Sequence, residues 1–197
     1  MDIKKEYKIK LIMEEEYSLA REVALGIIIK KPLKAWLYIV PGIFIVDFLR
    51  RGKEIRRYGD HYMFPRTLAL ESIHYDAENN KIDNIMSGHE RAISDRLTAL
   101  ELFSEEIKNM YITLIKLLIG HYQKLIEASG KTFADLVNDT YKDRAQYDAF
   151  IEQLSSLEKN IDNAMIKRLK TKSIIERIPA GQEQLDIMRK KHADIFF

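Results

Sequence analysis

The chain has 197 residues, of which 46% are apolar and 31% charged, a composition that suits one folded domain or a domain with an appendage and excludes a disordered chain. It contains no cysteine, which excludes disulfides, thiolate metal sites and cysteine nucleophiles. The net charge of +2 conceals a segregation of charge, because residues 30–66 carry nine basic and three acidic side chains, whereas residues 67–160 carry ten basic and sixteen acidic ones.

The first predicted element is an amphipathic helix over residues 3–29. Its apolar side chains Ile12, Leu19, Val23 and Ile27 recur at spacings of seven and four residues, which places them on one helical face. The opening sequence, MDIKKEYKIK, lacks the uninterrupted apolar segment of a secretory signal, so we expect the chain to stay in the cytosol.

The segment 33–49 is the most unusual part of the chain. Its residues 35–46 carry no charge, and the pair Pro41-Gly42 lies among them. Twelve residues make about 18 Å of helix, much less than the roughly 30 Å of a bilayer's hydrocarbon core. A full span would also place basic clusters on both sides of the membrane, which orientation rules disfavour. A short helical hairpin that turns at Pro41-Gly42 and re-emerges on the same side avoids both problems.

This hairpin presents an apolar and a basic set of side chains. We expect the apolar set to contact the membrane: Trp36, Leu37, Tyr38, Ile39, Val40, Pro41, Ile43, Phe44, Ile45 and Val46. We expect the basic set to bind anionic lipid, at about 1 kcal/mol for each side chain: Lys30, Lys31, Lys34, Arg50, Arg51, Lys53, Arg56 and Arg57. A buried core helix is the alternative for the apolar run. No nucleic-acid-binding module accompanies the cations, so we expect no nucleic-acid partner.

Gly59 and Pro65 predict a connector over residues 58–65, with Pro65 as the first residue of the next helix. The chain is therefore divided into residues 1–66, the N-terminal helix with the attachment hairpin, and residues 67–197, a long-helix bundle.

The helix that begins at Pro65 is expected to run to about residue 77, with a turn at residues 78–81. An apolar pattern then continues from residue 82 to residue 128, about 70 Å if the helix is unbroken. A capping box at residues 87–90 fits its beginning, and Gly130 fits its end. Thr132 and Asp135 fit a second capping box, which opens the next helix.

That next helix extends to about residue 170, with a candidate break at residues 140–143. Its short joint to the preceding helix predicts an elongated antiparallel hairpin. The apolar stripe over residues 97–125 exceeds what this partner can cover, so we expect a coiled-coil-like homodimer or higher homo-oligomer through the long helices. A turn at residues 178–181 precedes a last helix, whose terminal aromatics Phe196 and Phe197 we expect to pack back on the bundle.

Glu71 and His74 form a single Glu-x-x-His pair. Ferritin-like di-metal bundles use this pair twice, with further Glu ligands from two other helices. The second pair is missing, so Glu71 and His74 are weak metal candidates and we predict no cofactor. No phosphate loop, zinc-protease motif or Gly-x-Ser-x-Gly is present, which favours binding over catalysis.

The sequence therefore predicts an all-α, non-catalytic scaffold or adaptor, attached monotopically to the cytosolic face of a membrane through residues 33–49. Two alternatives remain: a soluble helical oligomer that associates through residues 35–49, and a ferritin-like metal-binding bundle.

Overall fold

The computed structural model describes residues 3–29, 41–76, 82–170, 175 and 177–197, and for residues 28, 29, 41–51, 75, 76, 82–85 and 177 it describes the backbone alone. These residues form helices without any strand, so the predicted all-α fold class is confirmed. The helices are α1 (Ile3–Ile29), α2 (Pro41–Asp76), α3 (Ile82–Ala99), α4 (Glu105–Glu127), α5 (Phe133–Tyr141), α6 (Arg144–Ile166) and α8 (Arg177–Phe196).

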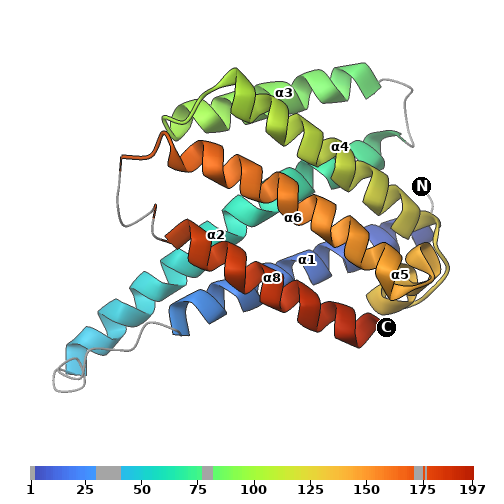
Figure 1. Cartoon of the computed structure of the whole chain (residues 1–197), viewed down its shortest axis with the longest axis horizontal. Coiled ribbons are helices and arrows are strands. Elements are labelled where there is room, and N and C mark those ends of the chain that lie inside the picture. Colours follow the sequence, from blue (N-terminus) through green and yellow to red (C-terminus); the bar gives the residue numbers. More distant parts are fainter. Residues whose placement is uncertain (1–2, 30–40, 77–81, 171–174, 176) are drawn as a thin grey trace.

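Five of these helices form a closed ring. Each packs against the next, in the order α1, α2, α4, α6, α8 and back to α1. The helix α3 packs outside this ring on α2 and α4, and the short α5 contacts α4, α6 and α8 near the C-terminal end of the chain (Figure 1). The N-terminal part of α2 extends beyond the ends of α1 and α8, at the lower left of Figure 1.

The helix α2 continues without interruption through Gly59 and Pro65, so the predicted connector at residues 58–65 is wrong. Proline removes one helical hydrogen bond, but packing on both sides of Pro65 holds the helix together, since Met63 and Leu68 are buried. Pro41 opens α2, where a missing N–H costs nothing. The predicted division at residue 66 falls within α2 and stays a prediction.

The predicted 70 Å helix is broken between α3 and α4. Glu101 has a φ of 57°, in the left-handed region that stops a helix. The N–H of Leu102 donates to the carbonyl of Leu97 at 2.8 Å, and the N–H of Glu101 donates to the carbonyl of Thr98 at 3.0 Å. These two bonds form a Schellman motif, and the buried Leu97 and Leu102 supply its hydrophobic contact.

Two predicted boundaries in the second half of the chain are confirmed. Thr132 accepts from the N–H of Asp135 at 3.2 Å, and Asp135 accepts from the N–H of Thr132 at 2.9 Å, which completes the predicted capping box of α5. The chain also breaks at the predicted place, because α5 ends at Tyr141 and Asp143 caps α6 by accepting from the N–H of Gln146 at 2.9 Å.

Two other predicted boundaries are wrong. Ser87 lies within α3 rather than at its cap, and residues 178–181 belong to α8 rather than to a turn. The beginning of α8 packs closely on α1, where a side chain at Gly26 would clash with Gln184. The packing of α8 on α1 therefore accounts for glycine at this position.

The apolar face of α4 is covered within a single chain. Leu114 is 2% exposed, and Leu118 and Leu125 are fully buried by the neighbouring helices. The uncovered stripe from which a dimer was predicted is therefore absent along α4, whereas Leu100, which precedes α4, is 48% exposed. The homodimer itself stays a prediction, without this support. At the C-terminus, Phe196 is buried against Phe133, as expected for a chain end that packs back, whereas Phe197 is 40% exposed.

Candidate functional site

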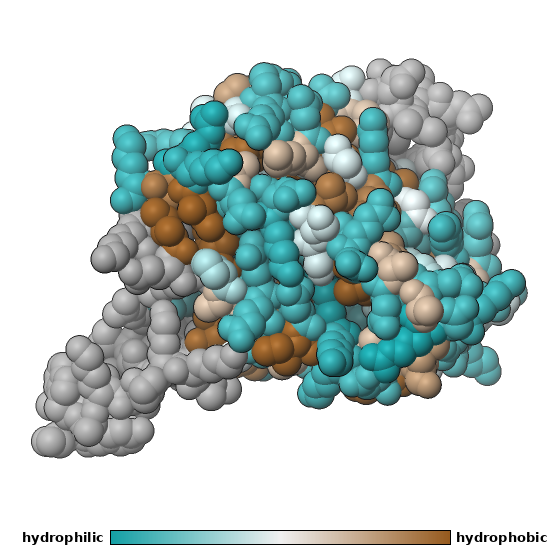
Figure 2. Space-filling view, viewed as in Figure 1, coloured by the Kyte–Doolittle hydropathy of each residue, from teal (hydrophilic) through white to brown (hydrophobic). Residues whose placement is uncertain are grey.

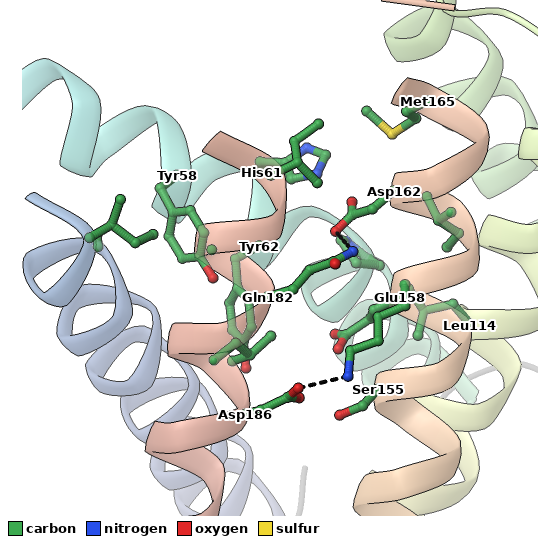
Figure 3. A pocket seen from close by; sticks show the side chains of 18 of the residues that line it. Tyr58, His61, Tyr62, Leu114, Ser155, Glu158, Asp162, Met165, Gln182 and Asp186 are labelled. Atoms are coloured by element: carbon green, nitrogen blue, oxygen red, sulfur yellow. Dashed lines mark hydrogen bonds and ion pairs between the residues drawn. The ribbon is translucent and has the colours of Figure 1, made fainter. Parts of the chain in front are cut away.

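A cavity of about 410 Å³ lies between the helices of the ring. Figure 3 shows the side chains that line it. The C-terminal part of α1, the middle of α2 and the first half of α8 line it, together with α4 and α6. Its volume lies in the range of small-molecule pockets, about 300–1,000 Å³. Apolar and aromatic side chains form most of the wall, among them Ile27, Tyr58, Tyr62, Tyr111, Leu114 and Met165.

The floor of the cavity, formed by Arg66, Glu158 and Arg189, belongs to a network of four charges that also includes Glu16. Each comes from a different helix of the ring; the two arginines are buried and the two glutamates are half-buried. Arg66 donates to Glu16 at 2.9 Å and to Glu158 at 2.7 Å. Arg189 donates to Glu158 through two nitrogens, at 2.7 and 3.1 Å. The two arginines and two glutamates are mutually compensated, as buried charges have to be.

Hydroxyl groups complete this charge network. The hydroxyls of Tyr62 and Tyr122 donate to the two carboxylate oxygens of Glu16, at 2.7 and 2.6 Å. The hydroxyl of Ser155 accepts from Arg189 at 2.8 Å. With Tyr122 from α4, every helix of the ring contributes a polar group to its centre.

The pKa values follow from this pairing. Burial raises the pKa of Glu158, but the charges of Arg189 and Arg66 outweigh it and hold the value at about 2. Burial likewise opposes ionisation of Glu16, yet the charge of Arg66 and the tyrosine hydrogen bonds lower its pKa. Both glutamates are therefore ionised at neutral pH, and the network is electrically neutral.

Asp162 and His61 occupy the wall above this floor, from α6 and α2 (Figure 3). The carboxylate of Asp162 accepts from the amide nitrogen of Gln182 at 2.9 Å. Burial raises the pKa of Asp162 to about 6, although the Gln182 hydrogen bond opposes the shift. Burial and the charges of Arg96 and Arg66 lower the pKa of His61 to about 4. At pH 7 the wall therefore presents a carboxylate and a neutral imidazole.

The side chains of the predicted membrane-contacting residues all lie outside the described part of the chain. Trp36–Val40 are beyond the described residues, and Pro41 and Ile43–Val46 belong to α2, where the backbone alone is described. Of the predicted lipid-binding residues, Lys30, Lys31 and Lys34 are also beyond the described residues, and Arg50 and Arg51 are described by backbone alone. Lys53, Arg56 and Arg57 are exposed on α2, and Arg57 also lies at the rim of the cavity.

The weak metal candidates lie apart from this cavity. Glu71 is exposed and His74 is half-buried, both on the last turns of α2. Near them, Ser72 hydrogen-bonds His89 at 2.7 Å. Within the described parts of the chain, no group of three or more His, Asp or Glu side chains could hold a metal ion.

The charge network was not predicted from the sequence, although a signal for it exists. Each of the four charged residues falls on the buried stripe of its own helix, four residues after an apolar one. Glu16 follows Ile12, Glu158 follows Leu154, Arg66 follows Tyr62 and Arg189 follows Leu185. Glu16 therefore belongs to the buried stripe of α1, because both of its neighbours at helical spacing, Ile12 and Leu19, are buried.

Comparison of the chain with protein-family models, with curated proteins and with solved structures finds no match. Among the described helices, none is long and apolar enough to cross a bilayer.

Proposed function

We propose that the protein is a non-catalytic helical scaffold that attaches to an anionic membrane surface through an arm, which we define as residues 33–57. The observation that supports this proposal is the projection of α2 beyond the rest of the bundle (Figure 1). From residue 41 to residue 53, just before the cavity-lining Glu54, the helix extends over about 18 Å, at 1.5 Å per residue. A segment that projects in this way can reach a surface without disturbing the ring.

Charge and hydropathy along the arm also support attachment to a membrane. Residues 35–46 are the longest uncharged run of the sequence, and Lys53 and Arg56 are exposed where α2 leaves the bundle. The bundle itself is mostly hydrophilic on the face shown in Figure 2, with hydrophobic residues in smaller separate areas. An apolar segment flanked by cations combines hydrophobic insertion with attraction to anionic lipid.

Flotation with liposomes tests this proposal. The full chain should float with vesicles that contain phosphatidylserine, and less well with pure phosphatidylcholine. The double variant Ile43→Asp, Phe44→Asp should stay at the bottom of the gradient with an unchanged circular dichroism spectrum. The matched control is Leu100→Asp, Phe103→Asp, which changes two exposed apolar side chains of the bundle and should float like the wild type.

The cations of the arm have their own test. Lys53→Gln with Arg56→Gln should weaken vesicle binding at low salt by about 30-fold, because each cation near an anionic surface contributes about 1 kcal/mol. The proposal fails if the Ile43 and Phe44 variant floats like the wild type. It also fails if the wild type never floats but self-associates, with loss of association in that variant. The latter result would establish the alternative in which residues 35–49 join copies of the chain.

A further inference from the structure

Most charges around the cavity are paired with one another. Glu158 lies between two arginines, as described above, and Lys159 donates to Asp186 at 2.7 Å. At the mouth, Glu54 and the exposed Arg57 carry opposite charges on neighbouring turns of α2. Asp162 differs from these groups, because its hydrogen-bond partner among the described residues is the neutral amide of Gln182.

An ionised Asp162 is therefore a negative charge in a cavity wall that solvates it poorly. The pKa of Asp162 rises to about 6 for the same reason, since burial disfavours the ionised carboxylate. A cation inside the cavity would compensate this charge. An anion inside the cavity would not be compensated in this way, because the nearby arginines Arg66 and Arg189 already bind the carboxylates of Glu16 and Glu158.

The aromatic wall also favours a cation. Tyr58 stacks on Tyr62 with ring centroids 6.2 Å apart, and Tyr111 lines the cavity from α4. Aromatic faces attract ammonium and guanidinium groups. The guanidinium of Arg66 already lies 3.4 Å from the centroid of Tyr62, which leaves Tyr58 and Tyr111 as rings for a ligand.

Further hydrogen-bond acceptors lie on α2. His61 is neutral at pH 7, so one of its ring nitrogens is an acceptor, and no hydrogen bond joins it to another described residue. Pro65 has no N–H, so α2 supplies no helical donor to the carbonyl of His61. A ligand with several N–H donors matches these acceptors better than a quaternary ammonium, which has none.

We propose that the cavity binds a protonated amine that carries an apolar or aromatic group, with Asp162 as the carboxylate that binds the ammonium. The volume of about 410 Å³ leaves room for an organic body beside the charged group. Ile27, Leu114 and Met165 supply apolar contacts for that body. This site is independent of the attachment of the arm to a membrane.

Isothermal titration calorimetry of the full chain at pH 7.5 tests the proposal with three probes that share an indole ring. Tryptamine ends in an ammonium, tryptophol in a hydroxyl and indole-3-propionate in a carboxylate. We expect tryptamine to bind at least about tenfold more tightly than tryptophol, because hydrogen bonds to charged groups are stronger than neutral ones. Indole-3-propionate should show no saturable binding.

Two matched variants test the role of Asp162. Asp162→Asn should lower the affinity for tryptamine at least about tenfold and leave that for tryptophol within about twofold. Asp186→Asn makes the same change in the same wall, but at a carboxylate already paired with Lys159, and should lower tryptamine affinity less than about threefold. Circular dichroism confirms that each variant is folded.

Several results would overturn the proposal. Equal affinities for tryptamine and tryptophol would show that the charge is not recognised. Equal losses in the Asp162 and Asp186 variants would show that general electrostatics, and not Asp162, attracts the amine. Absence of saturable tryptamine binding up to millimolar concentration would exclude the amine site itself.

Discussion

Replacement of Glu158 by glutamine removes one charge from the centre of the ring and keeps the shape of the side chain. Glu158 is the group that joins the two arginines, since its carboxylate accepts from Arg66 at 2.7 Å and from Arg189 at 2.7 and 3.1 Å. Its side chain is 15% exposed, so solvent screens these contacts weakly. Glutamine would leave the two guanidinium groups with a single compensating carboxylate, that of Glu16.

The size of the effect follows from the pKa of Glu158 and from the cost of breaking buried ion pairs. A pKa of about 2 for Glu158, against the usual 4.5, corresponds to about 3 kcal/mol of stability at pH 7. Removal of one partner from a buried ion pair generally costs about 3–5 kcal/mol. We therefore expect Glu158→Gln to lower the free energy of unfolding by about 3–5 kcal/mol at pH 7.

The pH dependence of this loss has a definite sign. The pKa of Glu158 is lower in the folded chain than in the unfolded one, so its stabilisation is present above pH 4.5 and disappears as the pH falls through about 2. The difference in stability between wild type and Glu158→Gln should accordingly shrink as the pH falls from 5 to 3.

Urea denaturation followed by circular dichroism measures both quantities. The control is Glu152→Gln, an exposed glutamate on the same helix, which should change the free energy of unfolding by less than about 0.5 kcal/mol. A loss below about 1 kcal/mol for Glu158→Gln at pH 7, or a loss that stays constant down to pH 3, would refute the reasoning.

Three further predictions concern stability. Asp162→Asn should be more stable than the wild type at pH 7, by up to about 3 kcal/mol, because the pKa of Asp162 is raised from 3.8 to about 6. In urea titrations this gain should appear as the pH rises from 3.8 to 6 and be absent at lower pH. Leu118→Ala should cost about 2–5 kcal/mol, because Leu118 is fully buried within one chain, and a dependence of this cost on protein concentration would contradict that origin. The hydrogen bond with Glu15, at 3.0 Å, raises the pKa of His192, so the protonated His192 stabilises the folded chain below pH 6.5, and this contribution is lost at higher pH. Thermal unfolding should show His192→Gln less stable than the wild type at pH 6, with a smaller difference at pH 9.

The sequence predicted the helices more reliably than their ends. Regular apolar spacing indicated α1, α4 and α6, because burial of one face decides whether a helix forms. The end of α3 escaped prediction because Glu101 adopts the left-handed conformation that usually belongs to glycine. Gly59 and Pro65 led to the opposite error, a predicted break within the continuous helix α2. Packing of the flanking turns outweighs the weak helix propensity of these two residues.

The candidate site was less predictable, for a physical reason. A charged residue on an apolar stripe, such as Glu16 or Glu158, can be recognised from helical spacing alone. Its partner cannot, because the order of the helices around the ring decides which charges meet. Asp162 lies one residue from the buried Ile161 and four from Glu158, and the cavity beside it exists only after five helices have packed.

The single tryptophan, Trp36, permits the most direct test of membrane attachment, because it belongs to the segment that we propose enters the lipid. Its fluorescence emission is measured as the full chain is titrated at low salt with vesicles containing phosphatidylserine, with and without brominated acyl chains. Insertion predicts a shift of the emission to shorter wavelength and quenching by the brominated lipids, and neither effect in the Ile43→Asp, Phe44→Asp variant. An emission maximum that stays unchanged at saturating lipid, without quenching, would contradict the proposed attachment.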